Sequence, residues 1–298
     1  MARRQRGQPI SGWVVLDKPV GMTSTVAVGR VRHLLDARKA GHGGTLDPLA
    51  TGLLPIALGE ATKAIHAVFD GRKTYRFTLR WGEARDSDDA DGAVTGRSPV
   101  RPSTEQIRTA LPAFTGPIRQ VPPDYSAIKV DGERAYALKR AGEAVSLAAR
   151  EVTVHRFTLV EQPDPDTATF EVDCGKGTYI RALARDLALE LGTLAHVTRL
   201  RRVAVGPFRE GDSITLEKLE ALCHVAPPSG TVLPVETALA DIPALAVTGA
   251  EADRVRRGQA IRTPIARSGL VCVTAAGKPV ALAHVQDGEV RPARVFNL

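Results

Sequence analysis

A glycine-rich segment with a single acidic residue, residues 41–52 (GHGGTLDPLATG), constrains the fold of this chain most. Its four glycines permit tight turns and close approach of the backbone to another group. Pro48 biases Asp47 toward an extended conformation, and leucines flank that carboxylate. Because burying a charge without a partner is unfavourable, the segment predicts a rigid loop that presents one acid in a partly apolar pocket. An ordinary turn containing Asp-Pro is the alternative.

The length and charge of the chain limit the number of its domains and the kind of partner it can bind. At 298 residues it is expected to form one large domain plus a small one, or two domains. A hydrophobic content of 43% is enough for a sizeable core. The net charge of +7 favours a polyanionic partner, with nucleic acid ahead of an anionic membrane.

Targeting and membrane segments are not expected. Residues 1–8 carry three arginines, but the apolar run that follows is too short for a secretory signal. No run approaches the ~18 apolar residues of a membrane helix. We therefore expect a soluble, cytoplasmic protein with a disordered basic tip and no membrane partner.

Metal and cofactor motifs are also missing from the sequence. Cys174, Cys223 and Cys272 lie far apart and form no CxxC pair, so we expect buried free thiols. The histidines show no HExxH spacing. The sequence therefore predicts no metal site and no cofactor.

Periodicity predicts a mixture of helices and strands. Apolar residues at helical spacing predict helices over 24–37, with Ser24 as the N-cap, and over 178–191. A capping box from Ser103 to Gln106 predicts a third helix start. Alternation predicts strands over 73–81 and 170–174, and a strand over 152–159 with a bulge near Arg156. The fold class is therefore α+β, or mixed α/β.

Composition also divides the chain. The acidic residues 86–91 are expected to form a surface loop, and residues 120–150 a basic insertion on the body of the protein. A proline-rich stretch over 227–234 precedes short β-like runs over 270–273, 279–285 and 290–296. We expect a catalytic domain over 1–235 and a small β-rich domain over 236–298.

Five motifs in a fixed order carry a family resemblance. They are Asp17–Ser24 (DKPVGMTS), Gly43–Pro48 (GGTLDP), Lys73–Tyr75 (KTY), Gly175–Arg181 (GKGTYIR) and Leu200–Arg202 (LRR). In this order they resemble the bacterial tRNA pseudouridine synthases that modify the T-loop uridine at position 55 of tRNA. The resemblance covers about residues 10–210.

The resemblance implies an architecture and a partner. It implies a pseudouridine-synthase core with a central mixed or antiparallel sheet, flanking helices and a cleft. The basic insertion at about 120–150 would grasp tRNA, and the C-terminal domain would be a PUA-like RNA-binding module. The implied partner is the T-stem-loop of tRNA, bound by a monomer that needs no metal.

The resemblance also implies three catalytic residues. Asp47 resembles the catalytic aspartate, which would attack C1′ or C6 of the uridine or act as the base that opens a glycal route. Arg181 resembles the arginine that pairs with this aspartate and keeps it ionised. Tyr75 resembles the tyrosine whose ring lies on the target base. The reaction is an isomerisation, so it needs no redox cofactor or energy input.

Three further residues resemble substrate-binding positions. Tyr179 and Leu200 resemble walls of the base pocket. His42 resembles the residue that fills the space left when the uridine flips out of its stack. Without the family context, each of these would be interpreted as a core or structural residue.

Two other functions remain open from the sequence. An RNA-binding or tRNA-folding protein with incidental catalysis would have the same basic charge and C-terminal module. Only the set of Asp47, Tyr75 and Arg181 argues against it, because a pure binder does not need these residues. An acid–base hydrolase would want a second carboxylate paired with Asp47, and no motif supplies one.

Overall fold

The computed structural model describes residues 7–126, 128–130, 132–143, 145–225, 230–264 and 268–298. The expected basic tip at residues 1–6 lies outside this set. The chain forms two compact units. Unit 1 comprises residues 1–48, 52–70 and 205–298, and unit 2 comprises residues 49–51 and 71–204. The chain therefore leaves unit 1 directly after Pro48 and returns to it three residues later.

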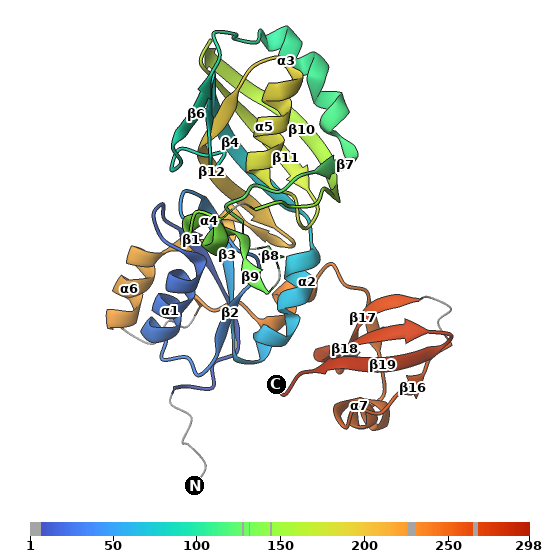
Figure 1. The fold of residues 1–298 in the computed structure, drawn as a ribbon. Coiled ribbons are helices and arrows are strands. Elements are labelled where there is room, and N and C mark those ends of the chain that lie inside the picture. The colour runs from blue at the N-terminus through green and yellow to red at the C-terminus, as the bar shows by residue number, and fades with distance from the viewer. Residues whose placement is uncertain (1–6, 127, 131, 144, 226–229, 265–267) are drawn as a thin grey trace. The chain divides into compact units, whose positions relative to one another are not determined.

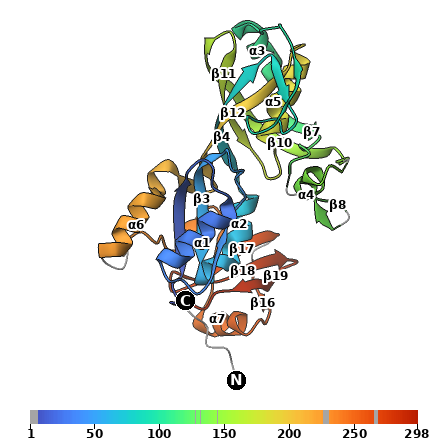
Figure 2. The ribbon, with the colours of Figure 1, turned by 60° about the vertical axis from the view of Figure 1, so that its left-hand side comes forward.

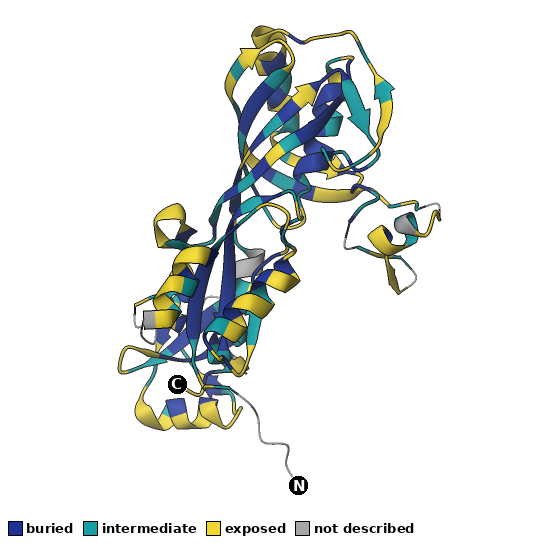
Figure 3. Ribbon diagram, turned by 90° about the vertical axis from the view of Figure 1, so that its left-hand side faces the viewer, coloured by how far each residue is buried: buried dark blue, intermediate teal, exposed yellow. Residues whose placement is uncertain are grey.

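The first part of unit 1 contains the strand order β14-β1-β3, with β2 paired to β3 (Figure 1). Strand β1 pairs in parallel with β14 and antiparallel with β3, and β2 pairs with β3. The elements of this part of unit 1 are β1 (Gly12–Lys18), α1 (Ser24–Leu34), β2 (Ala40–His42), β3 (Thr51–Leu58), η1 (Gly59–Ala64), α2 (Ile65–Asp70), β13 (Phe208–Arg209), η3 (Glu210–Asp212), β14 (Ser213–Thr215), α6 (Leu216–Val225) and η4 (Val235–Leu239). Strands β1 and β3 are buried along most of their length, whereas β2 and β14 are mainly half-buried and the neighbouring helices keep an exposed side (Figure 3).

The C-terminal residues of unit 1 form a separate five-stranded sheet in the order β15-β17-β18-β19-β16. Its elements are β15 (Ala244–Ala246), α7 (Gly249–Arg256), β16 (Ile261–Arg262), β17 (Gly269–Ala275), β18 (Lys278–Gln286) and β19 (Glu289–Val295). The three long strands match the predicted β-like runs. One apolar cluster lies within this module, but Leu282 and Phe296 belong to a second cluster that contains Trp13. The module thus shares part of its core with β1.

Unit 2 is built on the strand order β12-β4-β11-β10-β7 (Figure 2). Its elements are β4 (Lys73–Trp81), β5 (Glu83–Arg85), β6 (Val94–Arg97), α3 (Thr104–Ala110), η2 (Leu111–Phe114), β7 (Gly116–Gln120), β8 (Lys129–Val130), β9 (Glu133–Arg134), α4 (Ala135–Arg140), β10 (Arg150–Asp164), β11 (Thr167–Cys174), α5 (Ile180–Glu190) and β12 (Ala195–Val205). Pairing of β4 with β11, β11 with β10, and β10 with β7 is antiparallel. The expected α+β class is confirmed.

Local sequence signals placed most element boundaries. Strand β4 alternates between buried and less buried residues from Lys73 to Trp81, as predicted. The Ser103 capping box is present, and the pairing of β10 with β11 shifts register between Val154 and Arg156, where the bulge was predicted. The prediction that Ser24 is the N-cap of α1 was wrong. Thr23 caps the helix, and its hydroxyl accepts a hydrogen bond from Val26 N–H. Ser24 is buried and bonds elsewhere.

The acidic segment 86–91 is not the simple surface loop expected from its charge. Ser87 and Asp89 are only 6% and 5% exposed. Asp88 has a positive φ of 59°, and Gly92 packs so closely that a Cβ there would lie 2.2 Å from Asp86 Oδ1. The loop is therefore a folded element of unit 2, and its carboxylates are available as partners for buried cations.

Two findings bear on the wider expectations. No helix in the described parts of the chain is both long and apolar enough to cross a membrane. The cysteines are free, with Cys174 and Cys272 buried and Cys223 half-buried. Burial raises the pKa of the Cys174 thiol to about 11, so it is a poor nucleophile at neutral pH.

Candidate active site

Asp47 lies in unit 1, half-buried, in the loop between β2 and β3. The residue before it is fixed by the buried hydroxyl of Ser24. That hydroxyl donates to Leu46 C=O at 3.0 Å and accepts from Leu46 N–H at 2.9 Å. One side chain thus satisfies both backbone groups of Leu46, which is itself buried. The loop cannot shift at this point without leaving buried polar groups unpaired.

The residue after Asp47 is fixed by the segment Lys18–Gly21. Gly21 N–H donates to Pro48 C=O at 2.8 Å. The Lys18 ammonium, on a fully buried residue, donates to the carbonyls of Pro19 at 2.8 Å, Met22 at 2.7 Å and Pro48 at 3.4 Å. A buried ammonium needs several acceptors, and these three carbonyls supply them.

These contacts give physical roles to a motif that the sequence identified only by resemblance. Residues 17–24 and 43–48 are far apart in the chain, but Lys18, Gly21 and Ser24 hold the residues on both sides of Asp47. Hydrogen bonds to Leu46 and Pro48 thus hold the backbone on both sides of Asp47, whereas the expected partly apolar pocket stays a prediction. The catalytic role of Asp47 stays a prediction.

His42, the other predicted residue in unit 1, is half-buried and ends strand β2, where it pairs with Ile56 of β3. The next residue, Gly43, donates its N–H to Pro55 C=O at 2.9 Å. His42 thus stands at the end of a strand, directly before the loop that carries Asp47. Its proposed place in substrate binding stays a prediction.

Four of the predicted residues lie in unit 2. Tyr75, 8% exposed, is on β4 and pairs with Val172 of β11. Leu200, 7% exposed, is on β12, the strand next to β4. The Leu200 carbonyl accepts a hydrogen bond from the Thr51 hydroxyl at 3.4 Å. Neighbouring strands therefore carry Tyr75 and Leu200, with both side chains nearly buried.

Tyr179 and Arg181 lie at the start of helix α5. Tyr179 is the N-cap residue, with extended backbone angles, and Arg181 is in the first turn. The Arg181 side chain is only 4% exposed. Its Nη1 donates to Ser87 C=O at 2.7 Å and its Nη2 to Tyr125 C=O at 2.8 Å. Arg181 is therefore a buried, multiply bonded cation, unlike the solvated cation usual for a first-turn arginine.

An ion pair joins Arg181 to Asp89, with Asp89 Oδ2 3.5 Å from Arg181 Nε. The other carboxylate oxygen accepts from the Ser87 hydroxyl at 2.5 Å and from Asp91 N–H at 3.1 Å. Burial raises the pKa of the Asp89 carboxyl above its usual range, although the Ser87 hydrogen bond and the Arg181 charge oppose the rise. Asp89 is thus a fixed anionic support for the guanidinium.

A second pair lies one helical turn further along α5. Arg185 Nη1 is 2.9 Å from Asp88 Oδ2, and Arg185 Nη2 donates to Val121 C=O at 2.8 Å. Burial raises the pKa of the Asp88 carboxyl to about 6, although the Arg185 and Arg181 charges oppose the rise. Two successive acids of one loop therefore support two arginines spaced four residues apart on one helix.

Sequence reasoning missed Asp88, Asp89 and Arg185. The signal available was weak but physical. Arg181 and Arg185 are spaced by four residues, so they share a helix face. Most other residues of that helix are apolar, so arginines buried on it would need acids; Asp186 of the helix is one such acid, and the run at 86–91 supplies others.

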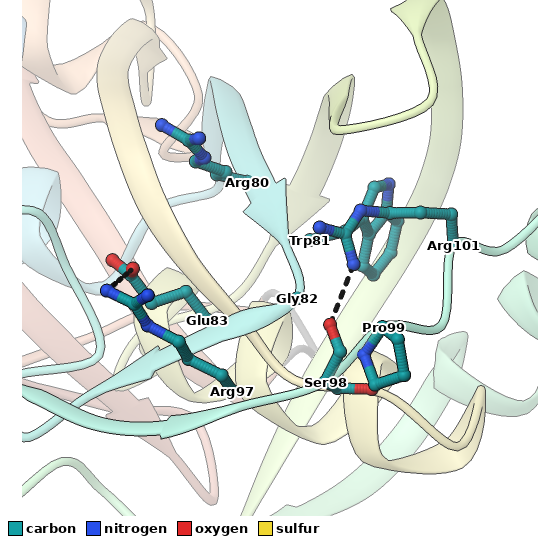
Figure 4. A pocket seen from close by; sticks show the side chains of 8 residues that line it. All are labelled: Arg80, Trp81, Gly82, Glu83, Arg97, Ser98, Pro99 and Arg101. Carbon is teal, nitrogen blue, oxygen red and sulfur yellow. Dashed lines mark hydrogen bonds and ion pairs between the residues drawn. The ribbon is translucent and has the colours of Figure 1, made fainter.

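A separate hollow of about 400 Å³ lies at the end of β4 (Figure 4). It is lined by Arg80, Trp81, Gly82, Glu83, Arg97, Ser98, Pro99 and Arg101. Arg97 lies 3.7 Å from Glu83, and Arg101 pairs with Asp166 at 2.5 Å. The arginines at its rim thus have carboxylate partners from the protein itself. None of the predicted site residues lines it.

Among the described residues, no group of three or more histidine, cysteine, aspartate or glutamate side chains is arranged to hold a metal ion.

Three families of known proteins match successive parts of the chain. The family described as "TruB family pseudouridylate synthase (N terminal domain)" matches residues 32–180. Two further families, "tRNA pseudouridylate synthase B C-terminal domain" and "Pseudouridine synthase II TruB, C-terminal", match residues 181–240 and 243–296.

Individual proteins are similar over nearly the whole chain. A protein of Bradyrhizobium diazoefficiens called tRNA pseudouridine synthase B is 59% identical over 305 residues, which cover 99% of this chain and 88% of that protein. A protein of the same name from Rhodospirillum rubrum is 52% identical over 308 residues and 100% of both chains. A chain in the crystal structure of a Cbf5-Nop10-Gar1 complex has a TM-score of 0.75 at 28% identity, covering 96% of this chain and 84% of that one.

Proposed function

This chain belongs to the TruB family of pseudouridylate synthases, and from that premise we propose that it converts the T-loop uridine at position 55 of tRNA to pseudouridine. The substrate class follows from the relatives named tRNA pseudouridine synthase B. The position within the tRNA follows from the motifs around Asp47, Tyr75 and Arg181.

One observation supports this proposal most directly: Asp47 is presented by a loop that is fixed on both sides. Ser24 holds Leu46, and Lys18 and Gly21 hold Pro48. A surface turn that happens to contain an acid has no need of a buried lysine and a buried serine. A carboxylate that must approach one particular atom of a substrate needs such supports, because effective catalysis depends on a fixed geometry.

Asp47 is the residue that we assign to the covalent chemistry. Pseudouridine formation breaks the N1–C1′ bond, turns the base and joins C5 to C1′, and the proton on C5 is lost while N1 gains one. The carboxylate acts on the nucleotide by attack at C1′ or C6 or as the base that opens a glycal route. Each route needs an ionised carboxylate at the uridine.

Arg181 and Tyr75 are assigned supporting roles in the same reaction. A buried guanidinium next to a carboxylate keeps that acid ionised and oriented, so Arg181 is proposed as the partner of Asp47. Its bonds to Ser87 and Asp89 would hold it in place for this role. The Tyr75 ring is proposed to contact the target base, with its hydroxyl near the proton-transfer positions.

The remaining predicted residues are assigned to substrate binding. Tyr179 and Leu200 would contact the flipped base, and His42 would occupy the space that the base leaves. Flipping a base costs a few kcal/mol of unstacking, and phosphate contacts offset that cost. We propose that the basic insertion at 120–150 and the β-rich C-terminal module, which we take to be PUA-like, supply these contacts.

The proposal extends to the setting of the enzyme. We propose that it acts in the bacterial cytoplasm, as a monomer that modifies tRNA without a metal ion. Size-exclusion chromatography with light scattering, and activity on a short stem-loop RNA after chelation, measure these two points. A dimer as the active species, or a loss of activity that only one added metal restores, would contradict them.

The proposed function is tested by comparing wild type with Asp47→Asn on a T-stem-loop transcript. Pseudouridine is mapped at each uridine, and RNA affinity is measured separately. We expect wild type to modify position 55 and the variant to form no detectable product while its Kd stays within about three-fold, because the substitution keeps the side-chain volume. This separates an enzyme from an RNA-folding protein.

The matched control is Asp166→Asn, which changes an exposed acid that pairs with Arg101 in unit 2. It should retain full activity. A transcript with cytidine at position 55 should remain unmodified. Substantial turnover by Asp47→Asn would remove this residue from the chemistry, and modification of another uridine by wild type would move the target position.

A further inference from the structure

The side chain of Gln120 makes an unusual pair of contacts at the start of helix α5. Gln120 is the last residue of strand β7 and is 1% exposed. Its Nε2 donates to Tyr179 C=O at 3.3 Å, and its Oε1 accepts from Tyr179 N–H at 3.1 Å. One buried amide thus satisfies both backbone groups of a single residue, as a neighbouring strand would.

Tyr179 is the residue at which helix α5 starts. It is the N-cap of α5, and its side chain makes no capping hydrogen bond. Its carbonyl also accepts the first bond of the helix, from Leu183 N–H at 3.0 Å. An N-cap fixed at both its N–H and its C=O determines where the helix starts. It therefore also determines where Arg181, two residues later, can place its guanidinium.

Gln120 is also the last residue before the basic insertion. Strand β7 pairs with β10, and its final register pair joins Gln120 to Arg150, where the insertion ends. The insertion therefore leaves and rejoins the sheet of unit 2 at Gln120 and Arg150 (Figure 2). Because the Gln120 side chain contacts Tyr179, it links the base of the insertion to the start of α5.

Two arginines of α5 reach the first residues of the same insertion. Arg185 donates to Val121 C=O and Arg181 to Tyr125 C=O, each at 2.8 Å. Together with the Gln120 amide, three side chains therefore join residues 120–125 to the first turns of α5. Of the three, the Gln120 amide is the neutral one, and it alone acts on the N-cap backbone.

We propose that Gln120 is a positioning residue for the reaction, which fixes the backbone of Tyr179, and through it Arg181, relative to the base of the insertion. The inference rests on the proposed function. Gln120 does not contact the reacting atoms in this assignment. It acts through Tyr179 and Arg181, so its loss should lower the rate of the chemical step more than the affinity for RNA.

The experiment compares wild type, Gln120→Met and Gln120→Glu in single-turnover reactions at saturating T-stem-loop RNA. Methionine keeps the volume and removes both hydrogen bonds. We expect its single-turnover rate to fall at least about ten-fold while Kd changes less than about three-fold. The reason is that misplaced catalytic residues slow the chemical step but leave the contacts that bind RNA in place. Gln162→Met is the control.

Gln162 is a suitable control because its amide also makes two bonds in unit 2 without involving α5. Its Nε2 donates to Pro102 C=O at 3.0 Å, and its Oε1 accepts from the Thr104 hydroxyl at 2.6 Å. The same substitution there should leave both rate and Kd close to wild type. A similar loss in the control would overturn the inference, because it would show that the loss of a side-chain amide elsewhere in this unit has the same effect.

Gln120→Glu adds a readout that a purely structural role would not give. An ionised carboxylate accepts from Tyr179 N–H but repels its carbonyl, whereas a protonated carboxyl donates to that carbonyl as the amide does. The rate relative to wild type should therefore rise as the pH falls. Charged groups near this junction are Arg150, Arg181, Arg185 and Asp88, so wild type and Gln120→Met are measured over the same pH range as baselines.

The outcomes separate this inference from the proposed function. A wild-type enzyme that makes no pseudouridine contradicts the proposed function. If wild type is active, a Gln120→Met rate within two-fold of wild type, or a loss that lies wholly in Kd, overturns the inference. Should Gln120→Met fail to fold by circular dichroism, Gln120→Glu decides: a relative rate that stays flat with pH overturns it.

Discussion

The loop that carries Asp47 in unit 1 and the helix start that carries Arg181 in unit 2 are both held firmly, but by different interactions. The residues beside Asp47 are held through main-chain carbonyl and N–H groups, by Ser24, Lys18 and Gly21. Arg181 is held partly by a buried carboxylate, that of Asp89, and a second, partly buried ion pair between Arg185 and Asp88 lies one helical turn away.

The difference has consequences for pH dependence and for mutation. Hydrogen bonds between a serine and the backbone do not titrate, so the support of Asp47 through Ser24 should persist across a wide pH range. An ion pair weakens when its acid is protonated, and burial raises the pKa of both Asp88 and Asp89. Acid should therefore loosen the support of Arg181 before it affects the contacts of Ser24.

After Asp47→Asn, the largest effect is expected at Arg181. Arg181→Met removes the cation and leaves Asp89 as a buried acid without its partner, which typically costs about 3–5 kcal/mol. We expect the single-turnover rate to fall by roughly 10³-fold or more. Arg181→Lys keeps the charge but loses the planar fork, so it should retain part of the activity.

The control for Arg181 is Arg101→Met, which removes another carboxylate-paired arginine of unit 2 outside the candidate site. Its rate should match wild type. A fully active Arg181→Met enzyme, with folding checked by circular dichroism, would mean that this arginine serves only the fold and that the comparison between the two supports has no bearing on catalysis.

Asp89→Asn should have the next largest effect. The amide keeps the volume and the contacts with Ser87, but Arg181 loses its charged partner, so the rate at pH 7.5 should fall roughly 20-fold. Because the pKa of Asp89 is raised, wild type loses the same ion pair when the pH falls through that raised value. The ratio of wild-type to variant rates should therefore narrow toward acid pH. A ratio that stays constant down to the lowest pH at which both proteins remain folded would argue against an ionic support.

Ser24→Ala tests the support of Asp47 by removing both bonds to Leu46. A buried polar group left unpaired costs about 1–3 kcal/mol, so we expect a rate loss of about ten-fold and a lower Tm. Unlike the loss in Asp89→Asn, this loss should not change with pH. Ser213→Ala, which removes an exposed hydroxyl bonded to Glu210 C=O in the same unit, is the control. If the rate loss in Ser24→Ala varied with pH, the supports of Asp47 and Arg181 would not differ in their pH dependence as proposed.

The smallest effect is expected on stability at Asp88. The pKa of this acid rises from 3.8 in a model peptide to about 6 in the folded protein. As the pH rises through this window, the Asp88 carboxyl loses its proton in the unfolded chain before it does so in the folded protein. Rising pH therefore favours the unfolded state, and the free energy of unfolding falls. Between pH 5 and pH 8 the loss amounts to about 1–2 kcal/mol.

Asp88→Asn removes this titration, so its free energy of unfolding should fall less than that of wild type between those pH values. Denaturant unfolding at pH 5, 6, 7 and 8 measures it. The same pH dependence in both proteins would mean that Asp88 is ionised in the fold over this whole range, and that burial does not dominate its environment.

Much of the fold followed from local sequence patterns. Alternation predicted β4 to the residue, and the Ser103 capping box and the bulge beside Arg156 were also confirmed. The boundary of α1 was less well predicted, because Thr23 and Ser24 are both good N-caps. Which of the two caps the helix depends on Leu46, which takes the Ser24 hydroxyl and lies 22 residues away.

The candidate site was predicted less completely. Order and spacing of motifs singled out Asp47, Tyr75 and Arg181, but they did not show what holds them. Asp89 lies 92 residues before Arg181, and Gln120 lies 59 residues before Tyr179. An acidic run in isolation is most simply interpreted as solvated, because unpaired charges avoid burial, and only the fold supplies the partners that reverse this preference.

The sequence by itself determined the elements, the motifs and the class of chemistry, since those depend on neighbours within a few residues and on the kinds of side chain present. The tertiary structure alone decided the supports: Ser24 on Leu46, Lys18 on three carbonyls, and Asp89 on Arg181. Each joins residues whose contact depends on how strands and helices pack. Burial then sets the strength of each contact, because a hydrogen bond or ion pair removed from water cannot be replaced by solvent when its partner is lost.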